Sequence, residues 1–161
     1  MQPGSGPRHL TFHPNGRHLY AINELANTVT CFDYTAASGM LTERQTISTL
    51  PTDFIGKSYT ADLKITPDGK FLYGTNRGHD SLAVFSVNAE NGTLTALGQT
   101  PTEKTPRSFC LVSGDQFVVS AGEGSHKLIV FRRDAQNGTL TPLKTYDCGK
   151  GPAWVMSLKL N

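Results

Sequence analysis

The chain has 161 residues, a formal net charge of +2 at pH 7, 37% hydrophobic residues and 17% charged residues. This is the composition of an ordinary globular protein, and it argues against a disordered chain. No apolar run reaches the roughly 20 residues of a membrane-spanning helix, so no membrane partner is expected. Lysine and arginine are scattered rather than clustered, which argues against a nucleic-acid partner.

The cysteines, histidines and first residues of the chain give a second set of exclusions. No basic segment followed by an apolar one opens the chain, so a secretory signal peptide is not expected. The cysteines Cys31, Cys110 and Cys148 are odd in number and lack the spacing of a metal site. We expect reduced, partly buried thiols in a cytoplasmic protein. The five histidines also lack metal spacing, and the sequence predicts no cofactor.

Two turn signals separate short apolar runs in the middle of the chain, between residues 59 and 100. The Pro-Asp-Gly of residues 67–69 fits a reverse turn, because proline fixes φ and glycine accepts a positive φ. The Asn-Gly of residues 91–92 is a strong hairpin signal. Four strands joined by tight turns predict an antiparallel meander.

The same unit recurs upstream and downstream of this stretch. Its clearest markers are Phe32, Phe85 and Phe131, each in the third apolar run of its unit. The intervals between these phenylalanines are 53 residues (85 − 32) and 46 residues (131 − 85). A period of this length, with four strands per unit, is typical of a β-propeller blade.

The chain therefore divides into three four-stranded blades and one further strand. We place the blades at about residues 6–49, 58–102 and 104–149, and a closing strand at residues 151–160. The prediction is an all-β partial propeller with about thirteen strands. Propellers close with roughly four to eight blades. We therefore expect a fragment of a longer protein, whose open edges need an N-terminal propeller half or self-association.

Charged side chains of successive blades are expected to converge at one mouth of the central channel. Antiparallel connectivity brings the start of each first strand and the end of each second strand to the same end of the propeller. These positions carry several charges: Arg8, Glu24, Arg77, Arg107 and Glu123, with His9 and Asp62 beside them. Charges that face a cavity lose hydration, which favours a functional site. The alternative is a set of ion pairs that hold neighbouring blades together.

Such a cluster suits an anionic substrate that contains an ester. Arginine offers planar, bidentate donors to phosphate or carboxylate, and a carboxylate kept ionised by arginines can act as a base toward water. We expect Glu24 to be this base, with Arg8 and Arg77 as the other catalytic residues. Substrate-binding roles are expected for four further side chains: Arg107, His79, Asp62 and His9. His13 and His18 flank a turn at the opposite end and are expected to be solvated.

Six motifs carry a resemblance to a known family: GPRHLTFHP at 6–14, YAINEL at 20–25, ADLKITPDG at 61–69, NR at 76–77, PTEKTPR at 101–107 and GPAWV at 151–155. In this order they resemble the propeller-type lactonase family, whose best-known bacterial members are 6-phosphogluconolactonases. Members of that family have seven blades, and this chain is similar to their C-terminal half. One local departure is Lys64, which replaces a frequent histidine.

The resemblance implies a function and its site. As part of a full propeller, the chain is expected to hydrolyse 6-phospho-D-glucono-1,5-lactone, a small anionic lactone, to 6-phosphogluconate in the pentose phosphate pathway. The family includes fungal carboxymuconate lactonising enzymes, whose proposed Arg, Glu and second Arg fall on Arg8, Glu24 and Arg77. Their histidine belongs to an earlier blade that this chain lacks. Two alternatives stay open: a related carboxymuconate-type enzyme and a non-catalytic propeller segment that acts as an interaction scaffold.

Overall fold

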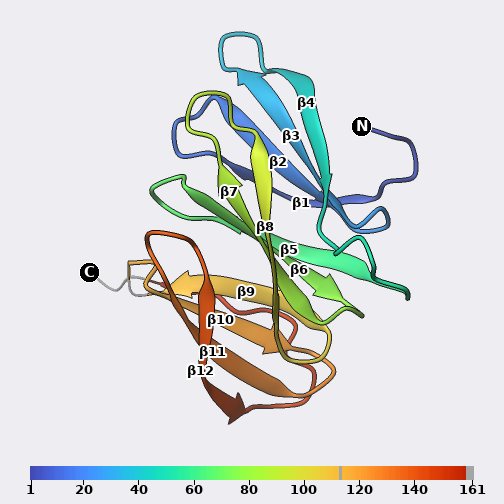
Figure 1. Cartoon of the computed structure of the whole chain (residues 1–161), viewed down its shortest axis with the longest axis vertical. Helices are drawn as coiled ribbons and strands as arrows, with labels where there is room; N and C mark the ends of the chain where they lie inside the picture. Colours follow the sequence, from blue (N-terminus) through green and yellow to red (C-terminus); the bar gives the residue numbers. More distant parts are fainter. Residues whose placement is uncertain (113, 159–161) are drawn as a thin grey trace.

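The computed structural model describes residues 1–112 and 114–158 of the chain. Its regular elements are twelve strands in three antiparallel sheets of four, and the described part contains no helix. Figure 1 shows the three sheets arranged one after another in chain order, from the blue sheet to the red one. The predicted all-β fold of three four-stranded blades is confirmed.

Each sheet is a meander whose strands are neighbours in chain order. We call the sheets blade 1, blade 2 and blade 3. Blade 1 contains β1 (Pro7–Phe12), β2 (His18–Asn23), β3 (Thr28–Thr35) and β4 (Met40–Ser48). Blade 2 contains β5 (Tyr59–Ile65), β6 (Phe71–Arg77), β7 (Ser81–Val87) and β8 (Leu94–Pro101). Blade 3 contains β9 (Pro106–Val112), β10 (Phe117–Gly122), β11 (Lys127–Arg133) and β12 (Leu140–Asp147).

The end of the chain differs from the prediction of a closing strand at 151–160. Residues 151–158 carry no strand assignment, and residues 159–160 lie outside the described residues. A strand exists only with a ladder partner, and an inner strand of a further blade would pair with the second strand of that blade. The described residues supply no such second strand. Within these same ranges, no helix is long and apolar enough to cross a membrane.

Alternation along the strands of blade 2 builds two apolar cores, one on each face of the sheet. Leu72 and Phe85, which lie opposite each other on β6 and β7, pack toward Tyr20 of blade 1. Tyr73, the next residue on β6, points the other way and packs with Phe109 of blade 3. All five side chains are at most 1% exposed. Because successive side chains point to opposite faces, a blade covered on both faces has nearly continuous apolar strands.

The Asn-Gly-Thr hairpins join each blade to the preceding one. Gly92 has a φ of +69°, and its carbonyl accepts a hydrogen bond from the Tyr20 hydroxyl at 2.8 Å. The carbonyl of Gly138, in the equivalent hairpin of blade 3, accepts a hydrogen bond from the Tyr73 hydroxyl at 2.8 Å. Asn91 fixes its turn, since its Oδ1 accepts hydrogen bonds from the backbone and side chain two residues later. The residues that predicted the hairpins therefore also hold the blades together.

The cysteines are free thiols, as the sequence predicts, and Cys31 and Cys110 are buried. Burial raises the pKa of the Cys31 thiol to about 11. The thiol also donates to the carbonyl of Gly92 at 3.2 Å. Because the thiolate is the reactive form, Cys31 is expected to be inert near neutral pH.

His13 and His18 are buried, which shows that the expectation of solvated rings is wrong. Their exposed fractions are 8% and 5%. A Cβ atom on Gly69 would lie 2.5 Å from Nε2 of His13, and one on Gly92 would lie 2.5 Å from Cγ of His18. Turns of blade 2 therefore lie directly on both rings, and both glycines have the positive φ that glycine tolerates. The covering turns are more than 50 residues away in sequence, so local reasoning misses them.

Stability is expected to fall in mild acid because of His13. Burial first, and then the nearby charge of His18, lower the pKa of His13, although hydrogen bonds with Gly69 and Asn15 partly offset this. The unfolded chain, with the ordinary pKa of 6.5, takes up a proton before the folded chain does. The contribution of His13 to stability is therefore fully present above about pH 6.5 and is lost as the pH falls below that value.

The measurement is the melting temperature between pH 7.5 and pH 5.0 for the parent and His13→Gln. The variant lacks the titrating ring, so its melting temperature is expected to depend less on pH. Equal slopes in both proteins would contradict the role of His13, whatever the variant's absolute stability.

Candidate functional site

The first strand of each blade (β1, β5 and β9), which we call its inner strand, has a β-bulge near the end at which the charged side chains gather. The strand register shifts at residues 7–9 of β1, at residues 60–63 of β5 and at residues 106–108 of β9. These three strands are neighbours in space. Bulges re-aim side chains and often lie beside functional sites. The three bulges thus redirect the side chains of Arg8 and Arg107 and of their neighbours at one mouth of the partial channel.

Glu24 lies between two arginines from different blades. Nε of Arg8, on β1, is 3.6 Å from Oε2 of Glu24. Arg77, at the end of β6, forms an ion pair with Oε1 through its Nη2. Both arginines also donate to β5, Arg8 to the carbonyl of Ala61 at 2.8 Å and Arg77 to that of Thr60 at 3.0 Å. The structure therefore brings together the three residues that we expect to be catalytic.

The cluster carries more positive than negative charge. Burial, and then the charge of Arg77, lower the pKa of Arg8. Glu24 offsets part of this effect, while Arg107 adds to it. The side chains of Arg8 and Arg77 are only 19% and 15% exposed, and that of Glu24 is 34% exposed. Arg8 and Arg77 share the single carboxylate of Glu24, so the group keeps an excess positive charge that favours an anion at this mouth.

Comparison of the blades explains why Glu24 has two partners. Blade 1 pairs Arg8 with Glu24, and blade 3 pairs Arg107 with Glu123 in the same way, with Nη1 3.4 Å from Oε2. Both pairs are separated by 16 residues. In blade 2 the corresponding positions are alanine and Arg77, so Arg77 has no acidic partner in its own blade and pairs with Glu24 of blade 1.

Asp62 is a buried carboxylate that joins the three inner strands. Its side chain is 0% exposed. Oδ1 accepts hydrogen bonds from Lys64 Nζ at 2.6 Å, from the Leu63 N–H at 2.9 Å and from His9 Nδ1 at 3.0 Å. Oδ2 accepts hydrogen bonds from the Ser108 hydroxyl and from the next N–H of β9, both at 3.2 Å. Both oxygens are therefore occupied by protein donors.

The bonds around Asp62 fix its charge and the tautomer of His9. Burial alone would raise the pKa of Asp62, but the hydrogen bond and charge of Lys64, followed by His9 and the Phe109 N–H, outweigh burial and lower it. Arg8 Nη1 lies 3.2 Å from Nε2 of His9. Because arginine can only donate, Nε2 accepts and Nδ1 carries the proton that is donated to Asp62. Asp62 is thus placed to orient His9 and Lys64.

A hollow of about 310 Å³ opens beside this carboxylate, and we call it the Lys64 hollow. Its polar and aromatic lining residues are Arg8, His9, Asp62, Lys64 and Trp154. Sequence reasoning missed two of them. Lys64 was visible only as an exchange within a motif, and Trp154 only as part of a strand. The signal that identifies Lys64 is its position two residues after Asp62, on the same face of β5.

The contacts of His79 are with residues outside the cluster of Arg8, Glu24 and Arg77. Its Nδ1 is 2.7 Å from the hydroxyl of Ser81, and its ring packs edge-on against Phe54 with centroids 4.9 Å apart. These contacts connect β7 to the loop that precedes blade 2 rather than to the charged cluster. A contact between His79 and substrate therefore stays a proposal.

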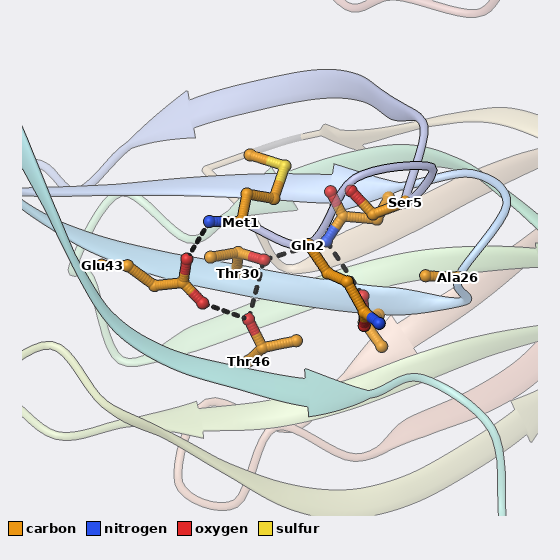
Figure 2. A pocket seen from close by; sticks show the side chains of 9 residues that line it. Met1, Gln2, Ser5, Ala26, Thr30, Glu43 and Thr46 are labelled. Atoms are coloured by element: carbon orange, nitrogen blue, oxygen red, sulfur yellow. Dashed lines mark hydrogen bonds and ion pairs between the residues drawn. The ribbon is translucent and has the colours of Figure 1, made fainter.

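A second pocket, of about 170 Å³, lies between the first residues of the chain and strands β3 and β4 of blade 1. Figure 2 shows the side chains that line it. It is lined mainly by small polar side chains, including Thr30 and Thr46, with Glu43 at its edge. It contains none of the converging arginines. Within residues 1–112 and 114–158, no three His, Cys, Asp or Glu side chains are grouped as a metal site requires.

Comparison with known proteins places these features in a family. The chain matches the family model described as "Lactonase, 7-bladed beta-propeller" over residues 1–157. A 6-phosphogluconolactonase of Pectobacterium carotovorum subsp. carotovorum (strain PC1) is 41% identical over 158 residues, which are 98% of this chain and 48% of the relative. A 6-phosphogluconolactonase of Bacillus subtilis (strain 168) is 40% identical over 120 residues, 74% of this chain and 34% of the relative. The chain thus spans less than half the length of these relatives.

A solved structure of a gluconolactonase has the same fold over most of this chain. The periplasmic gluconolactonase of Pseudomonas aeruginosa superimposes with a TM-score of 0.88 at 36% sequence identity. The match covers 93% of this chain and 42% of that protein. Three blades of this chain therefore correspond to part of a larger propeller.

Proposed function

Because this chain belongs to the seven-bladed β-propeller lactonase family, we propose that the complete propeller hydrolyses 6-phospho-D-glucono-1,5-lactone to 6-phosphogluconate. The observation that carries this proposal is the position of Glu24 between Arg8 and Arg77, two arginines from different blades. The names of the Pectobacterium and Bacillus relatives support the choice of substrate. Such hydrolysis would place the protein in the pentose phosphate pathway.

The site suggests a division of roles for ring opening by water. The carboxylate of Glu24 takes a proton from a water molecule whose oxygen forms a bond to the lactone carbonyl carbon. Arg8 and Arg77 stabilise the negative charge that develops on the carbonyl oxygen. Collapse of this intermediate breaks the bond to the ring oxygen, which takes the proton back from Glu24 and leaves as a hydroxyl group. Arg8 and Arg77 also hold the Glu24 carboxylate in place between the two blades.

The proposed substrate-binding residues divide into direct and indirect contacts. Arg107 belongs to the group of charges that acts on Arg8, so it can add to the attraction of an anion. His9 lines the Lys64 hollow and offers a ring edge to substrate. Asp62 has both oxygens occupied by protein donors, so we propose that it acts by positioning His9 and Lys64. His79 would contact substrate only from the side of β7.

The test uses a chimera in which this chain replaces the matching segment of the Pectobacterium relative, and we call this chimera the complete propeller. Release of acid from 6-phosphogluconolactone above the spontaneous rate supports the proposal. Hydrolysis of a carboxymuconate-type lactone instead would favour that alternative, which uses the same Arg-Glu-Arg arrangement. No hydrolysis of either lactone by a folded chimera would contradict the enzymatic proposal and leave the interaction scaffold.

We also propose a cytoplasmic location. The free thiols Cys31, Cys110 and Cys148 fit a reducing compartment. The Pseudomonas gluconolactonase is periplasmic, so the family fold alone does not decide the compartment. Fractionation of the producing cells, followed by detection of this chain, distinguishes the two locations.

The outer face of blade 1 supports a partner that continues the propeller. Leu10 and Phe12 of β1 lie opposite Ala21 and Leu19 of β2, so all four side chains share one face. Leu10 is 62% exposed and Phe12 is 45% exposed, whereas blade 2 covers the other face of the sheet. An apolar face of this kind favours either a preceding blade or a second copy of the chain.

This chain alone is therefore expected to self-associate as its concentration rises. The complete propeller is expected to remain monomeric, because a preceding blade covers the face that carries Leu10 and Phe12. Light scattering over a wide range of dilution measures both. Replacing Leu10 and Phe12 with glutamate should weaken the association of the chain alone. A monomer at every concentration would contradict this expectation.

A further inference from the structure

Lys64 is the one basic side chain of the Lys64 hollow that the proposed mechanism does not use. Its Nζ donates to Oδ1 of Asp62 at 2.6 Å and lies 5.7 Å from the ring centres of Phe109 and Trp154. The side chain is 33% exposed, so its ammonium group is accessible from the hollow. An ammonium group has three donors, and only one of them is used by Asp62.

The carboxylate that holds Lys64 does not compete for a ligand in the hollow. Asp62 is 0% exposed, and its oxygens accept hydrogen bonds from three strands. The exposed charged groups of the hollow are therefore the cations of Lys64 and Arg8, with the buried Asp62 carboxylate behind Lys64. An anion would meet two cationic groups there and no free carboxylate oxygen, which is the chemistry of a phosphate site.

Arg8 connects this hollow to the proposed catalytic carboxylate. Its Nε is 3.6 Å from Glu24, and its Nη1 is 3.2 Å from His9 in the lining of the hollow. In a 6-phosphorylated 1,5-lactone, the carbonyl carbon and the carbon that carries the phosphate-bearing arm lie on either side of the ring oxygen, so the phosphate is only a few atoms away from the carbonyl. Such a substrate can lie across Arg8, with its carbonyl near Glu24 and its phosphate in the hollow.

We propose that Lys64 binds the phosphate of the substrate and thereby selects phosphorylated lactones over unphosphorylated ones. This inference rests on the proposed function, because it assigns a specificity residue to the same reaction. Asp62 acts as a positioning residue that holds the ammonium group at the edge of the hollow. Arg8 contributes a second cationic group to the phosphate and keeps its contact with Glu24.

The test compares 6-phosphogluconolactone with unphosphorylated glucono-1,5-lactone in the complete propeller. A hydrogen bond to a charged group corresponds to about a 10- to 100-fold change in affinity. Lys64→Met is therefore expected to lower the ratio of the two kcat/KM values by about 10- to 100-fold. Lys64→Arg keeps a cationic donor and should restore part of this ratio.

The matched control is Lys70→Met, a lysine in the β5–β6 turn of the same blade whose side chain is 67% exposed. It should leave the ratio unchanged. An equal loss for both lactones in Lys64→Met would show that Lys64 has only a structural role and would overturn the proposal. An unchanged ratio in a folded Lys64→Met protein would overturn it as well.

A binding measurement separates this inference from the proposed function. If the complete propeller hydrolyses neither lactone, the proposed function fails, and calorimetric titration with 6-phosphogluconate and gluconate decides the role of Lys64. Tighter binding of the phosphorylated acid, lost in Lys64→Met and kept in Lys70→Met, supports the phosphate site. Equal binding of the two acids by the parent protein contradicts it.

Discussion

Replacing Glu24 with glutamine in the complete propeller is expected to lower kcat for lactone hydrolysis by about 10²–10⁴-fold, the usual effect of losing a general base. Glutamine keeps the size of the side chain and can still bond to Arg8 and Arg77, but it cannot accept a proton from water. The arginines lose their anionic partner, which increases the positive charge near the substrate. Binding of an anionic lactone is therefore expected to be kept while turnover is lost.

The control is Glu123→Gln, which alters the corresponding pair of blade 3. Glu123 contacts Arg107 at 3.4 Å and is 35% exposed, closely matching the 34% exposure of Glu24. Its replacement should have a much smaller effect on kcat. Melting curves must show that both variants are folded, and spontaneous hydrolysis must be subtracted from each rate. Equal rates for Glu24→Gln and the parent would show that Glu24 is not the base.

The fold could be predicted because its signals are local. Turn residues such as Gly69 and Gly92 determine the hairpins by their own φ angles, and they recur once per blade. The convergence of Arg8, Glu24 and Arg77 also followed from connectivity, since antiparallel strands return the chain to the same end. Which carboxylate pairs with which arginine did not follow from connectivity.

The remaining features depend on contacts between blades, which a sequence does not display. Arg77 pairs with Glu24 of blade 1 because blade 2 has arginine where the other two blades have glutamate. His13 is buried because a turn of the next blade lies on it. Lys64 is held at the edge of its hollow by Asp62, whose other oxygen is bound by Ser108 and Phe109 of β9. In each case a residue more than 40 positions away decides the environment of the side chain.

The largest loss of stability is expected for Asp62→Asn. Asparagine has the shape of aspartate but presents an N–H₂ group to donors such as His9, Lys64 and Ser108. Removing one partner of a buried ion pair usually costs about 3–5 kcal/mol, and we expect about 2–4 kcal/mol here, because Lys64 and His9 can turn to solvent. Unfolding in urea of the complete propeller measures this loss.

Acid provides an independent test of the same carboxylate. The pKa of Asp62 is lowered on folding, so its contribution is fully present above the unfolded value of 3.8 and is lost as the pH falls below it. As the pH is lowered through this range, the stability of Asp62→Asn should therefore decrease less than that of the parent. The control is Asp147→Asn, at the end of β12, where the carboxylate is 91% exposed and its pair with Lys127 spans 3.9 Å. An exposed ion pair contributes about 0–1 kcal/mol to the free energy of unfolding. A similar loss of unfolding free energy in Asp62→Asn and Asp147→Asn would therefore contradict the role of Asp62 as the link between the three inner strands.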